Sequence, residues 1–207
     1  MKRSLTIAAA AALAACASTP VSERPQVTAS DLDAVTAVLK RDFRERGQAK
    51  MNRVVLDEVQ RLCNLHGDNP PEALAKPLEE AQLKAIPIPA GSLIGDWKLG
   101  ERIAQSGRGS MWNDNPGVQE GGSCYNCHQI SPRVEAYGTI GPSLAGYGKI
   151  RGTSAEMQRY TYGRIYNSKA YSLCSQMPRL GHAGTLNEQQ IKDLVGLLLD
   201  PDSPVNK

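Results

Sequence analysis

The stretch Cys124-Tyr125-Asn126-Cys127-His128 decides the fold of this sequence. Its two thiols stand one helical turn apart and an imidazole follows directly, in the pattern C-x-x-C-H. A thioredoxin-like C-x-x-C would follow an apolar strand, whereas residues 113–123 are glycine-rich and typical of a loop. A zinc site would need a second ligand pair, and no other pair has the required spacing. The pattern therefore predicts one covalently attached haem c, bonded to Cys124 and Cys127, with His128 as an axial iron ligand.

Composition limits the size and class of the protein. The chain has 207 residues, with 24 Lys+Arg against 21 Asp+Glu and a formal net charge of +3. This length allows one compact domain with extensions or two small domains, and the weak charge does not favour a nucleic-acid partner. Only one Phe and two Trp are present, so a core of normal density needs aliphatic residues, the seven Tyr or a cofactor as filler. A bound haem would supply that volume.

The N-terminus has the features of an export signal. Lys2 and Arg3 precede an uncharged run over residues 5–15 that is too short to span a bilayer. The run ends in Leu13-Ala14-Ala15-Cys16, which resembles a bacterial lipobox, where the cysteine carries a lipid. Ordinary cleavage after Ala15-Cys16-Ala17 fits the small-x-small rule equally well. Both alternatives predict an exported, periplasmic protein. We take the signal peptide as residues 1–15, as the lipobox implies, and that alternative adds a lipid anchor on Cys16.

The next segments predict a tether and a small helical extension. Residues 16–30 are rich in Pro, Ser and Thr, and we expect a flexible tether there. Residues 31–90 should form the extension, and its end at residues 86–91 contains two prolines that favour a linker. Three helices are predicted within it: one begins at Ser30 or Asp31 and ends near residue 46, one covers about residues 49–65, and one begins at Pro70-Pro71 and breaks near Pro77.

Residues 91–207 are predicted to form the haem domain. One helix is expected over residues 96–107, where Gly100 and Gly107 would permit close approach to another helix. Its expected partner is the last helix, which begins at a capping box over residues 185–188 and ends before Pro201. The order of these helices around the C-x-x-C-H motif is that of class I cytochromes c. We therefore expect an all-α fold, a class I cytochrome c domain preceded by the helical extension.

A six-coordinate electron-transfer haem needs a second axial ligand, and a thioether raises its potential relative to a second imidazole. Met177 is the predicted ligand, because it precedes Pro178 in a loop shortly before the last helix. His182 is the alternative, although an exposed loop residue is its expected state. Met157 follows a capping box over residues 153–156 and is predicted to lie in the core. The other candidates lie in the signal peptide, in the extension or before the motif: Met1, Met51, His66 and Met111.

Two cysteines are left after the haem thiols and Cys16. In an exported protein, Cys63 and Cys174 most simply form a disulfide, which would clamp the extension onto the haem domain. The alternatives are that Cys174 is itself a haem ligand or a redox thiol, or that the two thiols are free or pair with another molecule.

The sequence resembles the SoxX family, the monohaem cytochrome c subunits of the SoxAX complex of thiosulfate oxidation. The residues that carry the resemblance are Gly122 through Gln129 around the motif, Gly141-Pro142-Ser143-Leu144, Gly146-Tyr147-Gly148, Met177-Pro178-Arg179 and, in the extension, Phe43 through Ala49, Asp57-Glu58-Val59-Gln60 and Cys63. In cytochromes of this kind, the carbonyl of the proline in the Gly-Pro loop accepts a hydrogen bond from the imidazole of the C-x-x-C-H histidine. The resemblance therefore implies a hydrogen bond from His128 to the Pro142 carbonyl.

The resemblance implies an electron-accepting subunit of an L-cysteine S-thiosulfotransferase, not catalytic alone and without catalytic residues of its own. Its partners would be a SoxA-like cytochrome in a heterodimer and, transiently, a sulfur-carrier protein and a soluble cytochrome c. Two other classes stay open: a free-standing periplasmic electron carrier and a haem sensor with a weakly held sixth ligand.

Overall fold

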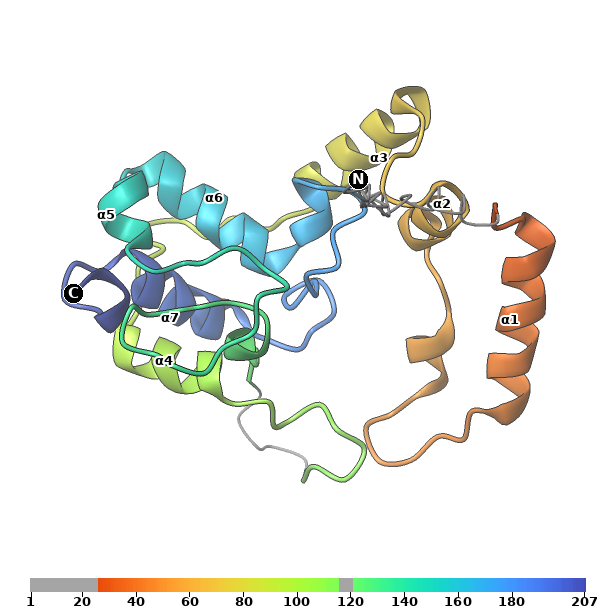
Figure 1. The fold of residues 1–207 in the computed structure, drawn as a ribbon, viewed down its shortest axis with the longest axis horizontal. Coiled ribbons are helices and arrows are strands. Elements are labelled where there is room, and N and C mark those ends of the chain that lie inside the picture. The colour runs from red at the N-terminus through yellow and green to blue at the C-terminus, as the bar shows by residue number, and fades with distance from the viewer. Residues whose placement is uncertain (1–25, 116–120) are drawn as a thin grey trace, which may run out of the picture.

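The protein is represented by a computed structural model that describes residues 26–115 and 121–207. The predicted signal peptide, Cys16 and most of the tether lie outside the described residues. Within them the fold is all-α, as predicted, with no β-strand beyond one isolated bridge between Arg46 and Ala49. Figure 1 shows the arrangement of its elements, which are α1 (Ala29–Asp42), η1 (Met51–Val54), α2 (Glu58–His66), α3 (Glu72–Lys84), α4 (Trp97–Gln105), η2 (Cys124–Asn126), α5 (Tyr147–Arg151), α6 (Ala155–Tyr166), η3 (Ser168–Ala170), α7 (Glu188–Leu199) and η4 (Pro204–Asn206).

The core of the C-terminal part is the pair α4 and α7. A side chain at Gly100 would overlap the main chain at Asp193, so the two helices touch at backbone distance, as the sequence predicted for that glycine. Gly107 lies beyond the end of α4 and approaches Ser123 instead, so its predicted role in the helix crossing is wrong. The carboxylate of Asp193 accepts a hydrogen bond from the Asp96 N–H at 3.0 Å. The start of α4 is thereby fixed to the side of α7.

α5, α6 and η4 complete this unit. Tyr162 and Ile165 of α6 are buried in one hydrophobic core with Leu194 and Val195 of α7. The C-terminal turn is fastened by Asn206, whose side-chain amide donates to the Leu198 carbonyl at 3.0 Å. Met157 is partly buried against the same core, as predicted, although the N-cap of α6 is Ser154 rather than Thr153, the first residue of the predicted box. The cap of α7 is likewise Asn187, with Gln190 completing the capping box.

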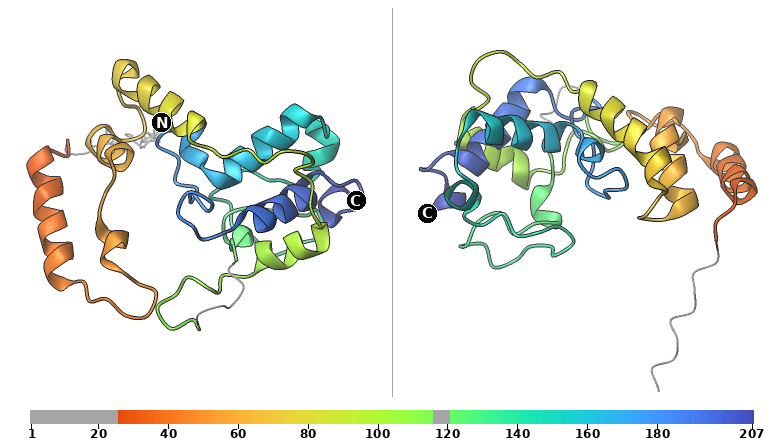
Figure 2. Two further views of the ribbon diagram at one scale, coloured as in Figure 1. Left: turned by 180° about the vertical axis from the view of Figure 1, so that it is seen from behind. Right: turned by 90° about the horizontal axis from the view of Figure 1, so that it is seen from above.

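α1, α2 and α3 lie in the stretch for which the helical extension is predicted. Figures 1 and 2 show α1 at the end of the molecule opposite to the C-terminal turn. α1 begins at Ala29 because Thr28 and Asp31 form a reciprocal capping box, so its first residues fall inside the predicted tether. It ends at Asp42, before the predicted end near residue 46.

The second predicted helix is wrong in its first half. Residues 49–65 do not form one helix: η1 is a separate turn, and α2 begins only at Glu58, after the N-cap Asp57. The break predicted near Pro77 is also wrong, because α3 continues through that residue to Lys84. Pro77 is exposed, so the helix loses one backbone hydrogen bond at a place where water can solvate the carbonyl that is freed.

Candidate functional site

The C-x-x-C-H segment forms a single helical turn. The N–H of Cys127 donates to the Cys124 carbonyl at 3.1 Å, and the N–H of His128 donates to the same carbonyl at 2.9 Å. The turn begins at Ser123, which has a left-handed φ of 50°. Cys124 and Cys127 are both free thiols rather than a disulfide. The segment therefore has the local geometry on which the haem prediction depends.

The Cys124 thiol is sequestered from water. Burial raises its pKa to about 11, so it is a neutral thiol at neutral pH. A Cβ atom added to Gly122 would lie 3.0 Å from the Cys124 Sγ and 3.5 Å from a methyl carbon of Leu180. The glycine thus marks the place where the C-x-x-C-H turn meets the loop that carries Met177.

His128 is oriented by its neighbours in the loop that follows. Its Nδ1 lies 2.7 Å from the Pro142 carbonyl oxygen, which confirms the hydrogen bond that the resemblance implied. A carbonyl only accepts, so Nδ1 carries the proton and Nε2 keeps its lone pair. A side chain at Gly141 would overlap the imidazole, so the ring lies directly against the backbone there. An imidazole held in this tautomer is the form that binds a metal through Nε2.

Met177 lies in a loop whose backbone is fastened on both sides. Its carbonyl accepts a hydrogen bond from the buried hydroxyl of Ser168 at 2.6 Å, and its N–H donates to the Ser175 hydroxyl at 3.2 Å. Lys169 adds bonds from its ammonium to the carbonyls of Leu173 and Ser175. The Met177 side chain is partly buried and packs against the core cluster, as does Cys124.

His182, the alternative ligand, is exposed. Its backbone N–H donates to the Tyr166 carbonyl at 3.0 Å. Partial desolvation, reinforced by the nearby Arg179, lowers the pKa of its imidazole. The surface position agrees with the expected state of this residue.

The predicted disulfide is confirmed. Cys63 of α2 is bonded to Cys174, with the two Cα atoms 5.4 Å apart and the two residues 111 positions apart in sequence. Cys174 lies three residues before Met177, so the bond joins the extension to the loop of the predicted axial ligand. The alternative readings of Cys174 as a haem ligand and of the pair as free thiols are wrong in this structure.

The sequence did not predict a second link at the same loop. The guanidinium of Arg179 forms an ion pair with the Asp57 carboxylate, with Nη2 and Oδ2 2.5 Å apart. The Arg179 side chain is only 13% exposed, and its Nη1 is buried without a hydrogen-bond partner among the described residues. The two residues are 122 positions apart. Neither residue type nor spacing could have revealed this pair.

The donor types at this site are those that haem c requires. Two unpaired thiols stand one turn apart, an imidazole presents a free Nε2, and a thioether lies in a braced loop nearby. Among residues 26–115 and 121–207, no three His, Cys, Asp or Glu side chains gather into a protein-only metal site. The residues present therefore fit a porphyrin-held iron that needs only two ligands from the chain.

Comparison with known proteins gives a relative whose activity is unknown. The chain is 38% identical over 159 residues to an uncharacterized lipoprotein of Aquifex aeolicus (strain VF5), and the match covers 73% of each protein. The two chains belong to one family. No family model matches the sequence.

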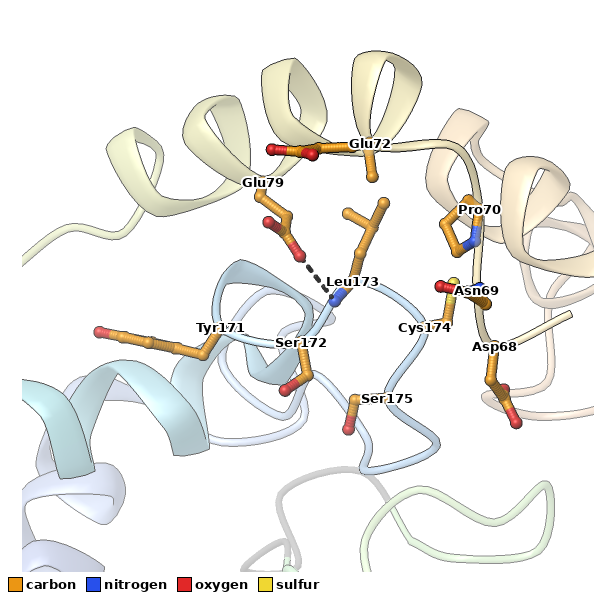
Figure 3. Close-up of a pocket in the computed structure, with 11 residues that line it drawn as sticks. Asp68, Asn69, Pro70, Glu72, Glu79, Tyr171, Ser172, Leu173, Cys174 and Ser175 are labelled. Atoms are coloured by element: carbon orange, nitrogen blue, oxygen red, sulfur yellow. Dashed lines mark hydrogen bonds between the residues drawn. The ribbon is translucent and has the colours of Figure 1, made fainter. Parts of the chain in front are cut away.

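In the described part of this chain, no helix is long and apolar enough to cross a membrane. The structure also has an open hollow of about 580 Å³ between α3 and residues 171–175, drawn in Figure 3. Cys174 lines it, and Glu79 spans it by accepting a hydrogen bond from the Leu173 N–H at 3.4 Å. None of its lining residues belongs to the C-x-x-C-H turn, so the hollow is not part of the candidate site.

Proposed function

We propose that this chain is an electron-transfer haem c protein of the SoxX kind, the electron-accepting subunit of a periplasmic thiosulfate-oxidising complex. The observation that supports this most directly is the C-x-x-C-H turn, with two free thiols and an imidazole whose Nδ1 is bonded to Pro142. One haem c would be held by thioether bonds at Cys124 and Cys127. When bound, that group supplies a centre that gains and loses single electrons.

The chain's own residues would hold and shield that centre. His128, fixed by Pro142 and by contact with Gly141, would present Nε2 to the iron on one side. Met177 would supply its thioether as a second ligand, from a loop whose backbone Ser168 and Ser175 fix. These residues would hold the group for electron transfer, and this subunit would contribute no catalytic residue.

The expected partners follow from the chemistry of the reaction. On a SoxA-like subunit, a sulfur–sulfur bond would form between thiosulfate and a carrier-protein cysteine, with loss of the thiol proton and of two electrons. This chain would take those electrons one at a time and pass each to a soluble cytochrome c. The complete assembly would be an L-cysteine S-thiosulfotransferase, in which this chain forms a heterodimer with the SoxA-like protein.

Exposed apolar residues lie beside the candidate site, where such partners could approach. Ile140, two positions before Pro142, is 80% exposed, and Tyr137 in the same loop is also exposed. An apolar loop next to the haem edge is a suitable contact surface for electron exchange between proteins.

A lipid on Cys16 is the second part of the proposal. The Aquifex relative is a lipoprotein, which supports the lipobox reading of residues 13–16 over ordinary cleavage. The mature chain would then be anchored to a membrane on its periplasmic side.

The alternative of a free-standing electron carrier is less well supported, because the extension is covalently attached beside the predicted Met177 ligand. A carrier of single electrons has no need of such an attachment. The haem sensor differs in another respect: it requires a weakly held sixth ligand, whereas the Met177 loop is fixed on both sides.

The decisive experiment is reduction of the haem by substrate. The chain is expressed with a haem-attachment system and mixed with thiosulfate, a sulfur-carrier protein and a SoxA-like cytochrome. We expect its haem to be reduced only when all three are present. A haem that stays oxidised in the full mixture, yet exchanges electrons readily with small cytochromes, would favour the free carrier. Ready binding of carbon monoxide by the native reduced protein would favour the sensor.

A further inference from the structure

Arg179 is an incompletely bonded cation inside the protein. Its guanidinium is largely buried, Nη2 donates to the Asp57 carboxylate at 2.5 Å, and Nη1 has no acceptor among the described residues. Buried polar groups in native proteins nearly always have a partner, and an unsatisfied donor of a charged group is especially costly. The free N–H therefore points to an acceptor that is not part of the described chain.

The charges around Arg179 indicate what kind of acceptor fits. Lys169 and His182 lie close enough for Arg179 to act electrostatically on both, and each is basic. Among residues 26–115 and 121–207, Asp57 is the one carboxylate paired with this group, and its oxygens already accept from Arg179 and from the Gln60 N–H. Basic side chains thus outnumber acidic ones here, so the site fits an anionic group rather than a second cation.

The position of Arg179 connects this donor with the candidate site. Arg179 follows Met177 by two residues. The next residue, Leu180, lies near Gly122, the glycine that also lies against the Cys124 sulfur. A haem carries two propionate carboxylates on its edge, and these are strong acceptors for a guanidinium.

We propose that Nη1 of Arg179 donates a hydrogen bond to a propionate of the haem, and that Asp57 is a positioning residue that holds the guanidinium for it. This inference rests on the proposed function. Asp57 is suited to that role because it caps α2, and α2 is bonded through Cys63 to the Met177 loop. The extension would therefore contribute to the surroundings of the haem as well as to partner binding.

The test compares four variants of the haem-loaded protein: Arg179→Gln, Arg179→Lys, Asp57→Asn and, as a control, Arg159→Gln at an exposed arginine of α6. Two quantities are measured in each, the reduction potential and the propionate bending mode in the resonance Raman spectrum. The second quantity reports hydrogen bonding to the propionate, which a merely structural ion pair would not change.

Opposite shifts of potential are the expected result. Arg179→Gln removes a positive charge beside the haem, so the potential should fall and the propionate mode should shift. Asp57→Asn removes a negative charge, so the potential should rise. Arg179→Lys keeps the positive charge but loses the planar set of N–H donors of the guanidinium. The reduction potential should therefore stay near the wild-type value while the propionate bending mode shifts. The Arg159 control should change neither quantity.

A wild-type propionate mode in Arg179→Gln or in Arg179→Lys would overturn this inference, even if one of the two variants failed to mature. Shifts of potential in the same direction for Arg179→Gln and Asp57→Asn would also overturn it, because that result indicates only a loosened Met177 loop. If the wild-type protein carries no haem at all, the proposed function fails together with this inference. If the wild type carries haem but the propionate mode does not respond to the Arg179 variants, only this inference fails.

Discussion

The imidazole of His128 is held by one hydrogen bond and one close contact, and both come from the same loop. The Pro142 carbonyl fixes the tautomer, and the backbone at Gly141 fixes the ring plane. The motif and the partner of its histidine could be predicted because they depend on local spacing and on a resemblance in one short loop. The Asp57–Arg179 pair could not, since its partners are distant in sequence and meet only when the extension folds back.

Substitution of Gly141 tests the role of the close contact. In Gly141→Ala the added methyl group would overlap the imidazole of His128, so the ring must move. We expect at least a tenfold lower yield of protein with a low-spin haem, measured by absorption per mole of chain. Thr139→Ala, at an exposed position of the same loop, is the matched control. Equal yields from both variants would contradict this account of His128.

Met177→Ala tests the distal ligand. Loss of the thioether should lower the reduction potential and replace the weak long-wavelength band of thioether-ligated ferric haem with a high-spin or bis-imidazole spectrum. His182→Ala should leave that band in place. If the band instead persists in Met177→Ala and disappears in His182→Ala, the assignment of the two residues is reversed.

The helices show which features of an element a sequence specifies. Apolar periodicity located most of them, but their first residues depend on which Ser, Thr, Asp or Asn makes the capping bond. Thr28 does so for α1, and Asn187 for α7, where neighbouring residues have nearly the same propensity. The prediction of one helix over residues 49–65 is wrong because the apolar spacing there is mixed. The capping box at Asp57 starts α2 at Glu58, nine positions after the predicted start at about residue 49.

The disulfide anchors α2 to the rest of the molecule. Removal of this bond should lower the free energy of unfolding by a measurable amount. In the loop-entropy model, opening a loop of this length by Cys63→Ser lowers the free energy of unfolding by about 5 kcal/mol as an upper figure. The haem spectrum should not change. The measurement is guanidinium denaturation of the haem-loaded protein, with Cys174→Ser as the matched variant. A changed spectrum in Cys63→Ser would show that the bond does more than fasten the extension.

The cap of α2 should also make stability depend on pH. Burial by itself would raise the pKa of Asp57, but the Gln60 N–H and the Arg179 guanidinium more than offset it and lower that pKa below its ordinary value. Such a carboxylate stabilises the fold above its unfolded pKa of about 4, and this contribution is lost as the pH falls through the folded pKa.

The corresponding measurement is the melting temperature of wild type and Asp57→Asn at several pH values. Wild type should be the more stable protein at pH 7, and the difference should shrink below about pH 4. A difference that is constant over this range would mean that the charge of Asp57 is not what stabilises the fold.

On the scale of the whole molecule, the extension is fastened to the C-terminal part at several places, among them the Asn167 amide, which donates to the Gln82 side chain of α3 at 2.8 Å. Near the Met177 loop the extension is held by the disulfide and the Arg179 ion pair, and near residues 110–114 Arg53 donates to the Ser110 carbonyl at 2.8 Å. α1, by contrast, keeps a row of exposed apolar side chains: Val35, Val38 and Leu39. Such a row is an expected contact surface for a partner subunit.

Charges introduced in this row test that role. The double variant Val35→Glu with Val38→Glu should weaken copurification with the SoxA-like cytochrome at least tenfold and leave the haem spectrum unchanged. Ala37→Glu, on the opposite side of α1, is the control with the same charge change. Undiminished copurification of the double variant would place the partner surface elsewhere, on the loop around Ile140.

The proposed function requires one covalently bound iron porphyrin, and the intact mass of the mature protein under denaturing conditions tests this most directly. We predict the mass of the processed chain plus one haem, and loss of that haem when Cys124 and Cys127 are both replaced by alanine. The mass of the polypeptide without haem, from cells that mature other c-type cytochromes normally, would contradict it.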